Sequence, residues 1–290
     1  MTDTIYRLVA WLSRRVGLWL VRVIAAIVAG AYFFLLPRRV HGSVRFYRAL
    51  FPARSGWHAL LCAWRQYQDF ARLYSERLEI ERRSDIRFEN EGEQQIAQIR
   101  AAGRGAILLM SHLGRWEIGA RLLGQRYAGL TLVMGGMVDG GARAGVDADL
   151  RSAGVDVVTV PAGQGQAFDI LRAMQTLRAG GVVSLAADRA DGDARMLRLP
   201  FLGQVAKVAA APFALALASG APVLVVFAVK LGPRHYRFSC DAPITLATTD
   251  RALRQQVMEQ AAAAYLGRLQ EMASSHPEQW QTFGDFLSRA

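Results

Sequence analysis

Residues 105–117 read GAILLMSHLGRWE and contain the clearest fold signal in the chain. An uninterrupted apolar run, Ala106–Met110, has the length and composition of a strand that is buried on both faces. A turn containing a glycine follows this run, and a helical pattern starts at Trp116. A buried strand that leads through a tight turn into a helix is the repeating unit of an α/β fold.

The same alternation of strand and helix continues from residue 85 to the end of the chain. The predicted strands are Ile86–Asn90, Ala106–Met110, Leu130–Met134, Val155–Val160, Val182–Ala186, Val223–Val229 and Tyr236–Cys240. The predicted helices are Glu93–Ala101, Trp116–Arg126, Ala142–Ala153, Gln166–Ala179, Ala209–Ser219 and Arg251–Ala273. This alternation predicts an α/β domain over residues 85–290, with a mostly parallel sheet flanked by helices.

An apolar segment of 21 residues, Val16–Leu36, precedes that domain. As a helix it would be roughly 30 Å long, which matches the hydrocarbon core of a bilayer. We therefore expect residues 1–40 to form a membrane anchor, with a helix embedded in one leaflet or a buried core helix as alternatives. More Arg residues follow the segment than precede it, which predicts that the chain after the segment faces the cytoplasm.

Between the anchor and the α/β domain, residues 41–84 form a predicted helical collar. The pattern in His41–Leu50 and Gly56–Leu78 is helical, and the second stretch has aromatic and apolar residues every three or four positions. Such a face usually packs against a core, and it can also lie on a membrane surface.

The composition excludes several protein classes. The chain has 290 residues, of which 52% are hydrophobic and 20% charged, so it is too apolar to remain disordered. Its net charge is +11, and 33 of its 35 basic residues are Arg, which suits an anionic partner such as nucleic acid, anionic lipid or an acidic carrier protein. Two cysteines are too few for a disulfide framework or a zinc site.

His112 is the candidate catalytic base. It follows a buried strand, and sites in open α/β sheets lie at the carboxyl ends of the strands. Glu117 comes five residues later, after the turn, where its carboxylate could bond one imidazole nitrogen while the other nitrogen faces a substrate. The spacings of the histidines do not make a metal site, and we expect no cofactor.

The segment SHLGRWE resembles the His-x4-Glu/Asp motif of membrane-associated acyltransferases, above all the late lipid A acyltransferases with H-x-G-N-W-E. Further blocks in the same order are similar to that family: Ala187–Arg189, Pro200–Gly203, Ser219–Val223 and His276–Trp280. The chain departs from the family pattern where Arg115 replaces the usual Asn. It also lacks an obvious basic residue between the motifs, in the stretch 157–168.

The resemblance implies that His112 acts as general base and Glu117 as its acidic partner. Asp188 stands where the family has an acidic residue after its core strand. The candidates for substrate binding are the charged residues nearest the predicted site: Arg115, Asp188, Arg189, Arg195 and Arg198. The family resemblance further implies an O-acyltransferase that moves a fatty acyl chain from acyl carrier protein, or from CoA, to a hydroxyl of a lipid such as a lipid A precursor.

Two functions from other classes compete with this hypothesis. Asp191 and Asp193 match the D-x-D pattern that holds a metal and a sugar nucleotide in glycosyltransferases, which would make the protein a membrane-anchored glycosyltransferase. A basic protein with an anchor could also bind anionic lipid without catalysis. We expect no nucleic-acid partner, because no nucleic-acid-binding module is recognisable.

Overall fold

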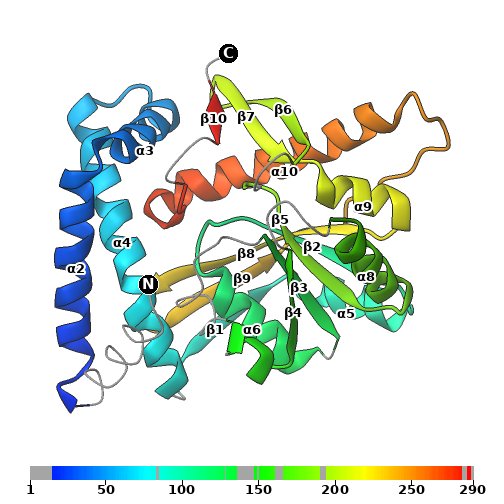
Figure 1. Ribbon diagram of the computed structural model, residues 1–290, viewed down its shortest axis with the longest axis horizontal. Helices are drawn as coiled ribbons and strands as arrows, with labels where there is room; N and C mark the ends of the chain where they lie inside the picture. Colours follow the sequence, from blue (N-terminus) through cyan, green and yellow to red (C-terminus); the bar gives the residue numbers. More distant parts are fainter. Residues whose placement is uncertain are drawn as a thin grey trace.

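A computed structural model describes residues 15–82, 85–127, 129–135, 147–148, 150–160, 166–189, 194–282 and 286–288 (Figure 1). Half of the predicted helix Ala142–Ala153, residues 142–146 and 149, lies outside the described residues, and so does the D-x-D pair Asp191 and Asp193.

The helices and strands alternate along the chain as the sequence predicts. The helices are α2 (Leu18–Leu35), α3 (Pro37–Leu50), α4 (Gly56–Arg82), α5 (Gln94–Ala101), α6 (Trp116–Arg126), α8 (Gln166–Arg178), α9 (Ala211–Ser219) and α10 (Arg254–Ser275). The strands are β1 (Arg87–Glu91), β2 (Ala106–Met110), β3 (Leu130–Gly135), β4 (Val155–Val160), β5 (Val182–Ala186), β6 (Met196–Phe201), β7 (Gln204–Ala209), β8 (Val223–Gly232), β9 (His235–Cys240) and β10 (Leu287–Ser288). A short 3-10 helix, η1 (Pro277–Gln279), follows α10.

A seven-stranded sheet in the order β1-β9-β8-β2-β5-β3-β4 forms the centre of the molecule. Its neighbouring strands pair in parallel, except that β8 and β9 form an antiparallel hairpin. The predicted α/β architecture with a mostly parallel sheet is therefore confirmed.

Helices cover both faces of this sheet, and the side chains of β2 alternate between two apolar cores. Ile107 and Leu109 belong to one core with residues of α8, α9 and α10. Leu108 and Met110 belong to the other, with residues of α5 and α6. A central strand buried on both faces reads as a continuous apolar run, which is why the sequence of β2 shows no polar alternation.

A second sheet of three strands, in the order β10-β7-β6, is absent from the prediction (Figure 1). The strand β6 contains Arg198 and Pro200, and a proline argues against a strand in a sequence pattern. The two strands join through Leu202 and Gly203, which both have positive φ angles, as a two-residue hairpin turn requires. β6 is an edge strand, and an edge strand tolerates a proline. The proline therefore conceals β6 in the sequence pattern.

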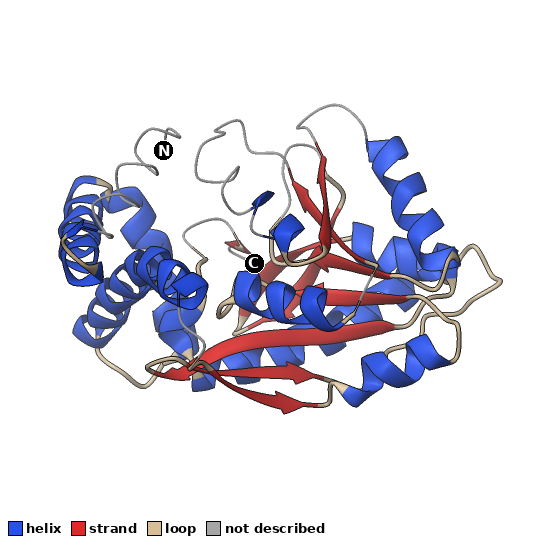
Figure 2. Ribbon diagram, turned by 90° about the horizontal axis from the view of Figure 1, so that it is seen from below, coloured by secondary structure: helices blue, strands red, loops and turns tan. Residues whose placement is uncertain are grey.

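The helices α2, α3 and α4 form a block beside one end of the main sheet (Figure 2). α2 and α4 run antiparallel. The Phe33 ring meets Trp64 and Tyr67 edge-on at 5.3 and 5.4 Å, and Arg22 bonds Glu79 at 2.7 Å near the other end of the pair. The apolar α2 is thus held along α4 for most of its length.

The helical block shares its core with the sheet. Phe46 and Tyr47 of α3 and Ala63 of α4 are buried in the same apolar cluster as Val225 and Phe227 of β8. The division into anchor, collar and α/β domain remains a prediction, and the structure adds that the collar and the sheet are packed together.

Candidate active site

Two neighbouring parallel strands bring His112 and Asp188 together. Met110 of β2 lies opposite Ala186 of β5 at the end of their shared ladder. His112 and Asp188 each stand two residues beyond that pair, so the continuing register places them side by side at the carboxyl edge of the sheet. This is the edge where open α/β sheets bind their ligands.

The two side chains form a hydrogen-bonded pair. Nδ1 of His112 lies 2.9 Å from Oδ1 of Asp188. The His112 side chain is 23% exposed, whereas that of Asp188 is 2% exposed. An ionised carboxylate can only accept a hydrogen bond, so Nδ1 carries the proton and Nε2 keeps a free lone pair. This is the tautomer that a general base requires.

Asp188 is buried and bonded by several donors. Its Oδ2 accepts from the backbone N–H of His112 at 2.8 Å and from the indole Nε1–H of Trp280 at 2.9 Å. Burial by itself raises the pKa of Asp188, but the imidazole of His112 and these hydrogen bonds overcome that effect and hold the pKa below its usual value. Asp188 therefore remains ionised at neutral pH and orients His112.

The turn after His112 depends on a glycine. Gly114 has a φ of 87°, and a Cβ atom there would lie 2.2 Å from the backbone oxygen of Ala228. The next residue, Arg115, donates its backbone N–H to the same oxygen. A side chain at position 114 would push the turn away from β8, so this close approach requires the glycine.

Arg115 is held by ion pairs inside the protein, and its role in substrate binding remains a prediction. The sequence suggests a substrate ligand, but the guanidinium is fully buried and bonds Asp69 at 2.8 and 2.9 Å and Glu76 at 2.6 Å, both on α4. Lys230 of β8 also bonds Glu76. Two carboxylates balance two cations here, which engages the Arg115 charge within the protein and ties α4 to the turn.

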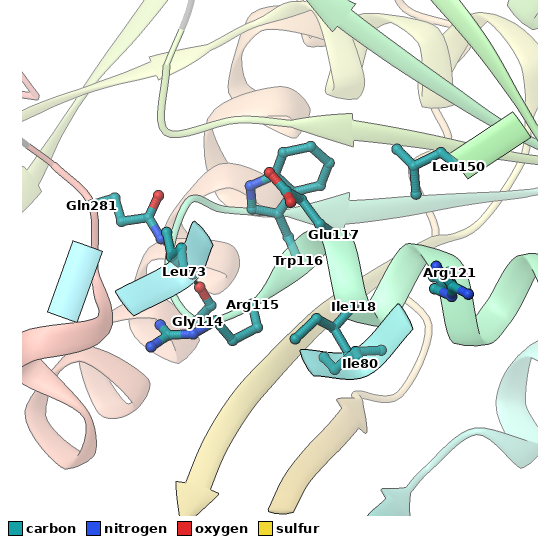
Figure 3. A pocket seen from close by; sticks show the side chains of 10 residues that line it. All are labelled: Leu73, Ile80, Gly114, Arg115, Trp116, Glu117, Ile118, Arg121, Leu150 and Gln281. Atoms are coloured by element: carbon teal, nitrogen blue, oxygen red, sulfur yellow. Dashed lines mark hydrogen bonds between the residues drawn. The ribbon is translucent and has the colours of Figure 1, made fainter. Parts of the chain in front are cut away.

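Glu117 lies in the first turn of α6 and lines a pocket between that helix and α4 (Figure 3). The pocket encloses about 560 Å³ including the part open to solvent. Its lining is mostly apolar: Leu73, Ile80, Gly114, Arg115, Trp116, Glu117, Ile118, Arg121, Leu150 and Gln281. Nδ1 of His112 bonds Asp188. A contact between Glu117 and His112 remains a prediction.

The other predicted substrate ligands are spread along the chain segment after β5. Arg189 is exposed and donates to the backbone oxygen of Gln281 at 3.0 Å. Arg195 is exposed and bonds the side chain of Gln255, and Arg198 lies on β6 directly opposite Lys207 of β7. Of these three arginines, Arg189 thus has a hydrogen bond to a residue of the pocket lining.

Several residues of the site were missed from the sequence. Arg121 stands one helical turn after Glu117 and lines the same pocket, as its four-residue spacing could have indicated. Asp69 and Glu76 lie on α4, where the pattern of aromatic and apolar residues predicts a packed helix and gives no sign that its acids meet Arg115. Trp280 reaches Asp188 across 92 positions of sequence, and no local pattern could have revealed that contact.

The comparisons with known proteins bear on this site. No individually curated protein matches the chain. A family model described as "bacterial lipid A biosynthesis acyltransferase" matches residues 62–285, from α4 to the segment beyond Trp280. This match covers most of the chain and includes His112, Glu117 and Asp188. The chain therefore belongs to the bacterial lipid A biosynthesis acyltransferase family.

Proposed function

We propose that the protein transfers a fatty acyl chain from a carrier thioester to a lipid hydroxyl, with His112 as the general base. The observation that carries this proposal is the His112–Asp188 pair. It combines an accessible imidazole with a buried carboxylate that fixes its tautomer. Membership of the acyltransferase family supplies the reaction class and implies an acyl donor and a lipid acceptor.

The proposed reaction has two steps. Nε2 of His112 takes the proton of the acceptor hydroxyl while the oxygen attacks the thioester carbonyl carbon, which gives a tetrahedral oxyanion. The oxyanion then collapses, the carbon–sulfur bond breaks, and the thiolate leaves with the proton from His112. The products are an ester and a free thiol. Asp188 stabilises the imidazolium that exists between the steps.

The pocket beside the turn supports a lipid substrate. Its walls are mostly apolar, and Glu117 and Arg121 place one acidic and one basic group among them. We propose that the apolar part of a lipid occupies this pocket and that Glu117 contacts the polar group being acylated. The acid would then act on the acceptor, while Asp188 serves as the partner of His112.

Substitution of the base tests the mechanism. His112→Ala should lower kcat roughly 10²- to 10⁴-fold in a purified assay, because it removes general-base catalysis. Glu117→Gln should also lower the rate, with folding unchanged as judged by circular dichroism. Near-normal turnover by His112→Ala would disprove the mechanism. Loss of activity on chelation of divalent metal would favour the glycosyltransferase alternative.

We propose acyl carrier protein as the donor in preference to acyl-CoA. Arg198 and Lys207 lie directly opposite each other on the β6–β7 hairpin. Like charges at such a cross-strand position destabilise a sheet unless a partner of opposite charge meets them. With Arg195 at the start of β6, they offer a basic surface to an acidic protein.

The donor assignment is tested by charge reversal on that hairpin. Arg198→Glu combined with Lys207→Glu should reduce turnover with the carrier-borne donor more than turnover with acyl-CoA, assayed in neutral detergent. Arg104→Glu, at a site away from this hairpin, serves as the control. Equal effects on both donors, or no salt dependence of the carrier reaction, would contradict the assignment.

We also propose that the protein associates with the inner membrane and that its catalytic domain faces the cytoplasm. α2 has a mean hydropathy of 2.2 and is long enough to cross a membrane. Only 22% of it is buried inside the protein, so most of this apolar helix is left to contact lipid. Large apolar side chains are exposed on α2 and on the neighbouring α4: Trp19, Val23, Ile24, Ile27, Val28, Tyr32, Phe34, Leu35, Trp57, Leu61 and Phe70.

The contacts of α2 favour side-on docking over a separate spanning helix. Arg22 and the backbone oxygen of Ala26 both bond side chains of α4, and Phe33 packs between two aromatic rings of that helix. A helix held in this way presents only its outer face to lipid, as monotopic helices do.

Reporters at the two ends of the chain separate the two modes. Side-on docking predicts that fusions before Met1 and after Ala290 both report from the cytoplasm, whereas a spanning α2 places them on opposite sides. A substitution of Ile27, which is 66% exposed, by Glu should reduce flotation with anionic vesicles. Unchanged flotation would contradict membrane contact through α2.

A further inference from the structure

Trp280 is fully buried where the chain passes beside the turn at Leu113 and Gly114. Its indole meets the rings of Phe46 and Phe286 edge-on, with ring centroids 4.9 and 5.0 Å away. The single polar atom of this side chain, Nε1, lies 2.9 Å from Oδ2 of Asp188. The packing fixes the plane of the indole, and the plane directs the N–H at the carboxylate.

The backbone around Trp280 is joined to the same turn. Gly114 donates its N–H to the oxygen of Gln279 at 2.9 Å, and Gln281 donates its N–H to the oxygen of His112 at 3.0 Å. Leu113 and Trp280 thereby form an isolated antiparallel bridge. Trp280 is thus held in register with His112 through the main chain as well as through Asp188.

We infer that Trp280 is a positioning residue for the proposed reaction: its indole N–H holds the Asp188 carboxylate in the orientation that bonds His112. The inference rests on the proposed function, in which His112 is the base. A carboxylate rotates readily about its terminal torsion, which has a broad energy profile. Trp280 Nε1–H and the His112 backbone N–H both donate to Oδ2. Their two bonds leave Oδ1 directed at Nδ1 of His112.

A purely apolar role of Trp280 does not account for the hydrogen bond from its indole nitrogen to Asp188. A phenyl ring could pack against Phe46 and Phe286, but it would offer no donor to Asp188. The Asp188 side chain is 2% exposed, so solvent has little access to replace a lost hydrogen bond. The structure therefore separates two contributions of Trp280, which are its volume and its N–H.

The experiment removes the N–H alone. β-(3-Benzothienyl)alanine at position 280 keeps the two fused rings and replaces N–H by sulfur, and Trp280→Phe is the simpler variant. We expect kcat to fall about 10- to 100-fold, the range for a lost hydrogen bond to a charged group, with KM within twofold of wild type. The acid limb of the kcat profile should move to higher pH, because a carboxylate with fewer donors favours the protonated imidazole of His112 more strongly, and a protonated imidazole cannot act as the base.

Trp64→Phe is the matched control, since Trp64 packs on α2 and not on the His112–Asp188 pair. An unchanged kcat and acid limb in the benzothienyl variant would overturn the inference. A loss of rate that follows only the folded fraction, or a rise in KM at constant kcat, would also overturn it.

A proton NMR signal separates this inference from the proposed function. The Nδ1 proton of His112, assigned by its absence in His112→Gln, should shift when the indole N–H is removed. An unshifted signal overturns the positioning role. If His112→Ala keeps normal turnover while this signal shifts, the proposed function fails and the positioning of Asp188 by Trp280 stands.

Discussion

Two polar clusters lie on either side of the turn at Leu113 and Gly114, and they differ in how fully they are paired. On one side, Asp188 holds the imidazole of His112, whose second nitrogen remains available. On the other side, Arg115 and Lys230 meet Asp69 and Glu76, so that two cations face two carboxylates. The first cluster is incomplete in that it leaves one imidazole nitrogen without a charged partner among the described residues. The second cluster is balanced in charge around the buried Arg115 and Glu76, with Lys230 and Asp69 partly exposed at its edge.

The difference shows how one turn can serve both chemistry and stability. A buried charge pair is costly to assemble and destabilising to break, so it fixes the geometry of the chain around it. An imidazole nitrogen with a free lone pair adds little to stability, but it can exchange a proton with a substrate. The balanced cluster thus holds in place the turn on which the incomplete cluster depends.

The largest expected effect comes from the incomplete cluster. Asp188→Asn should reduce kcat roughly 10²- to 10⁴-fold, because an amide no longer holds the Nδ1–H tautomer or stabilises the imidazolium. The measurement is steady-state kinetics with the fold checked by circular dichroism. Asp241→Asn, which removes a carboxylate bonded to Arg268, is the control.

The same variant distinguishes Asp188 from Glu117 as the partner of His112. Adding Asp188→Asn to His112→Ala should cost little further rate, because residues that act as a unit are non-additive. Activity of Asp188→Asn within twofold of wild type would show that the two clusters do not differ in the proposed way.

The balanced cluster should respond in stability. Arg115→Met leaves the carboxylates of Asp69 and Glu76 without their main partner and should lower the free energy of unfolding by about 3–5 kcal/mol. Urea denaturation measures this loss. Adding Asp69→Asn to the variant should recover part of it, since one uncompensated charge disappears. A loss below about 1 kcal/mol would mean that the cluster does not support the turn.

The contrast between the clusters also explains what the sequence could predict. The sequence predicts His112 as a site residue because a buried strand ends just before it, and it predicts the sheet because the strands are continuous apolar runs. Asp188 was noted at the end of another strand. Its pairing with His112 depends on β2 and β5 being neighbours, and the order of strands in a parallel sheet leaves no local trace. The ion pairs of Arg115 could not be predicted, because its partners lie 39 and 46 positions earlier on α4.

The dependence of stability on pH should distinguish the buried carboxylate of Glu76 from carboxylates that are exposed. Burial by itself raises the pKa of Glu76, but the charges and hydrogen bonds of Arg115 and Lys230 outweigh this effect and lower it. A lowered carboxyl pKa contributes stability that is complete above the unfolded value and is lost as pH falls through the folded value. The stability of the wild type should therefore decline below about pH 4 to 5.

The matching variant tests this dependence. Glu76→Gln should be less stable than the wild type at pH 7, and its stability should decline less steeply as the pH falls, because one of the titrating groups is gone. Urea midpoints measured from pH 7 to pH 3 provide the comparison, with Glu271→Gln at an exposed position as the control for loss of a carboxylate. Parallel curves for Glu76→Gln and the wild type would contradict the assignment.

The smallest expected effect lies at the rim, where two adjacent residues of α4 reach the segment that carries Trp280. Arg65 bonds Glu278 at 3.3 Å, and their side chains are 55% and 39% exposed. Gln66, the next residue, is buried and donates to the backbone oxygen of Trp280 at 2.5 Å. Arg65→Ala should change the free energy of unfolding by less than about 1 kcal/mol, because water screens the pair. Gln66→Ala should cost about 1–3 kcal/mol, because it leaves a buried carbonyl without its donor. If the two losses measured by urea denaturation were equal, burial would not be what separates the contacts that hold this site together from those that only surround it.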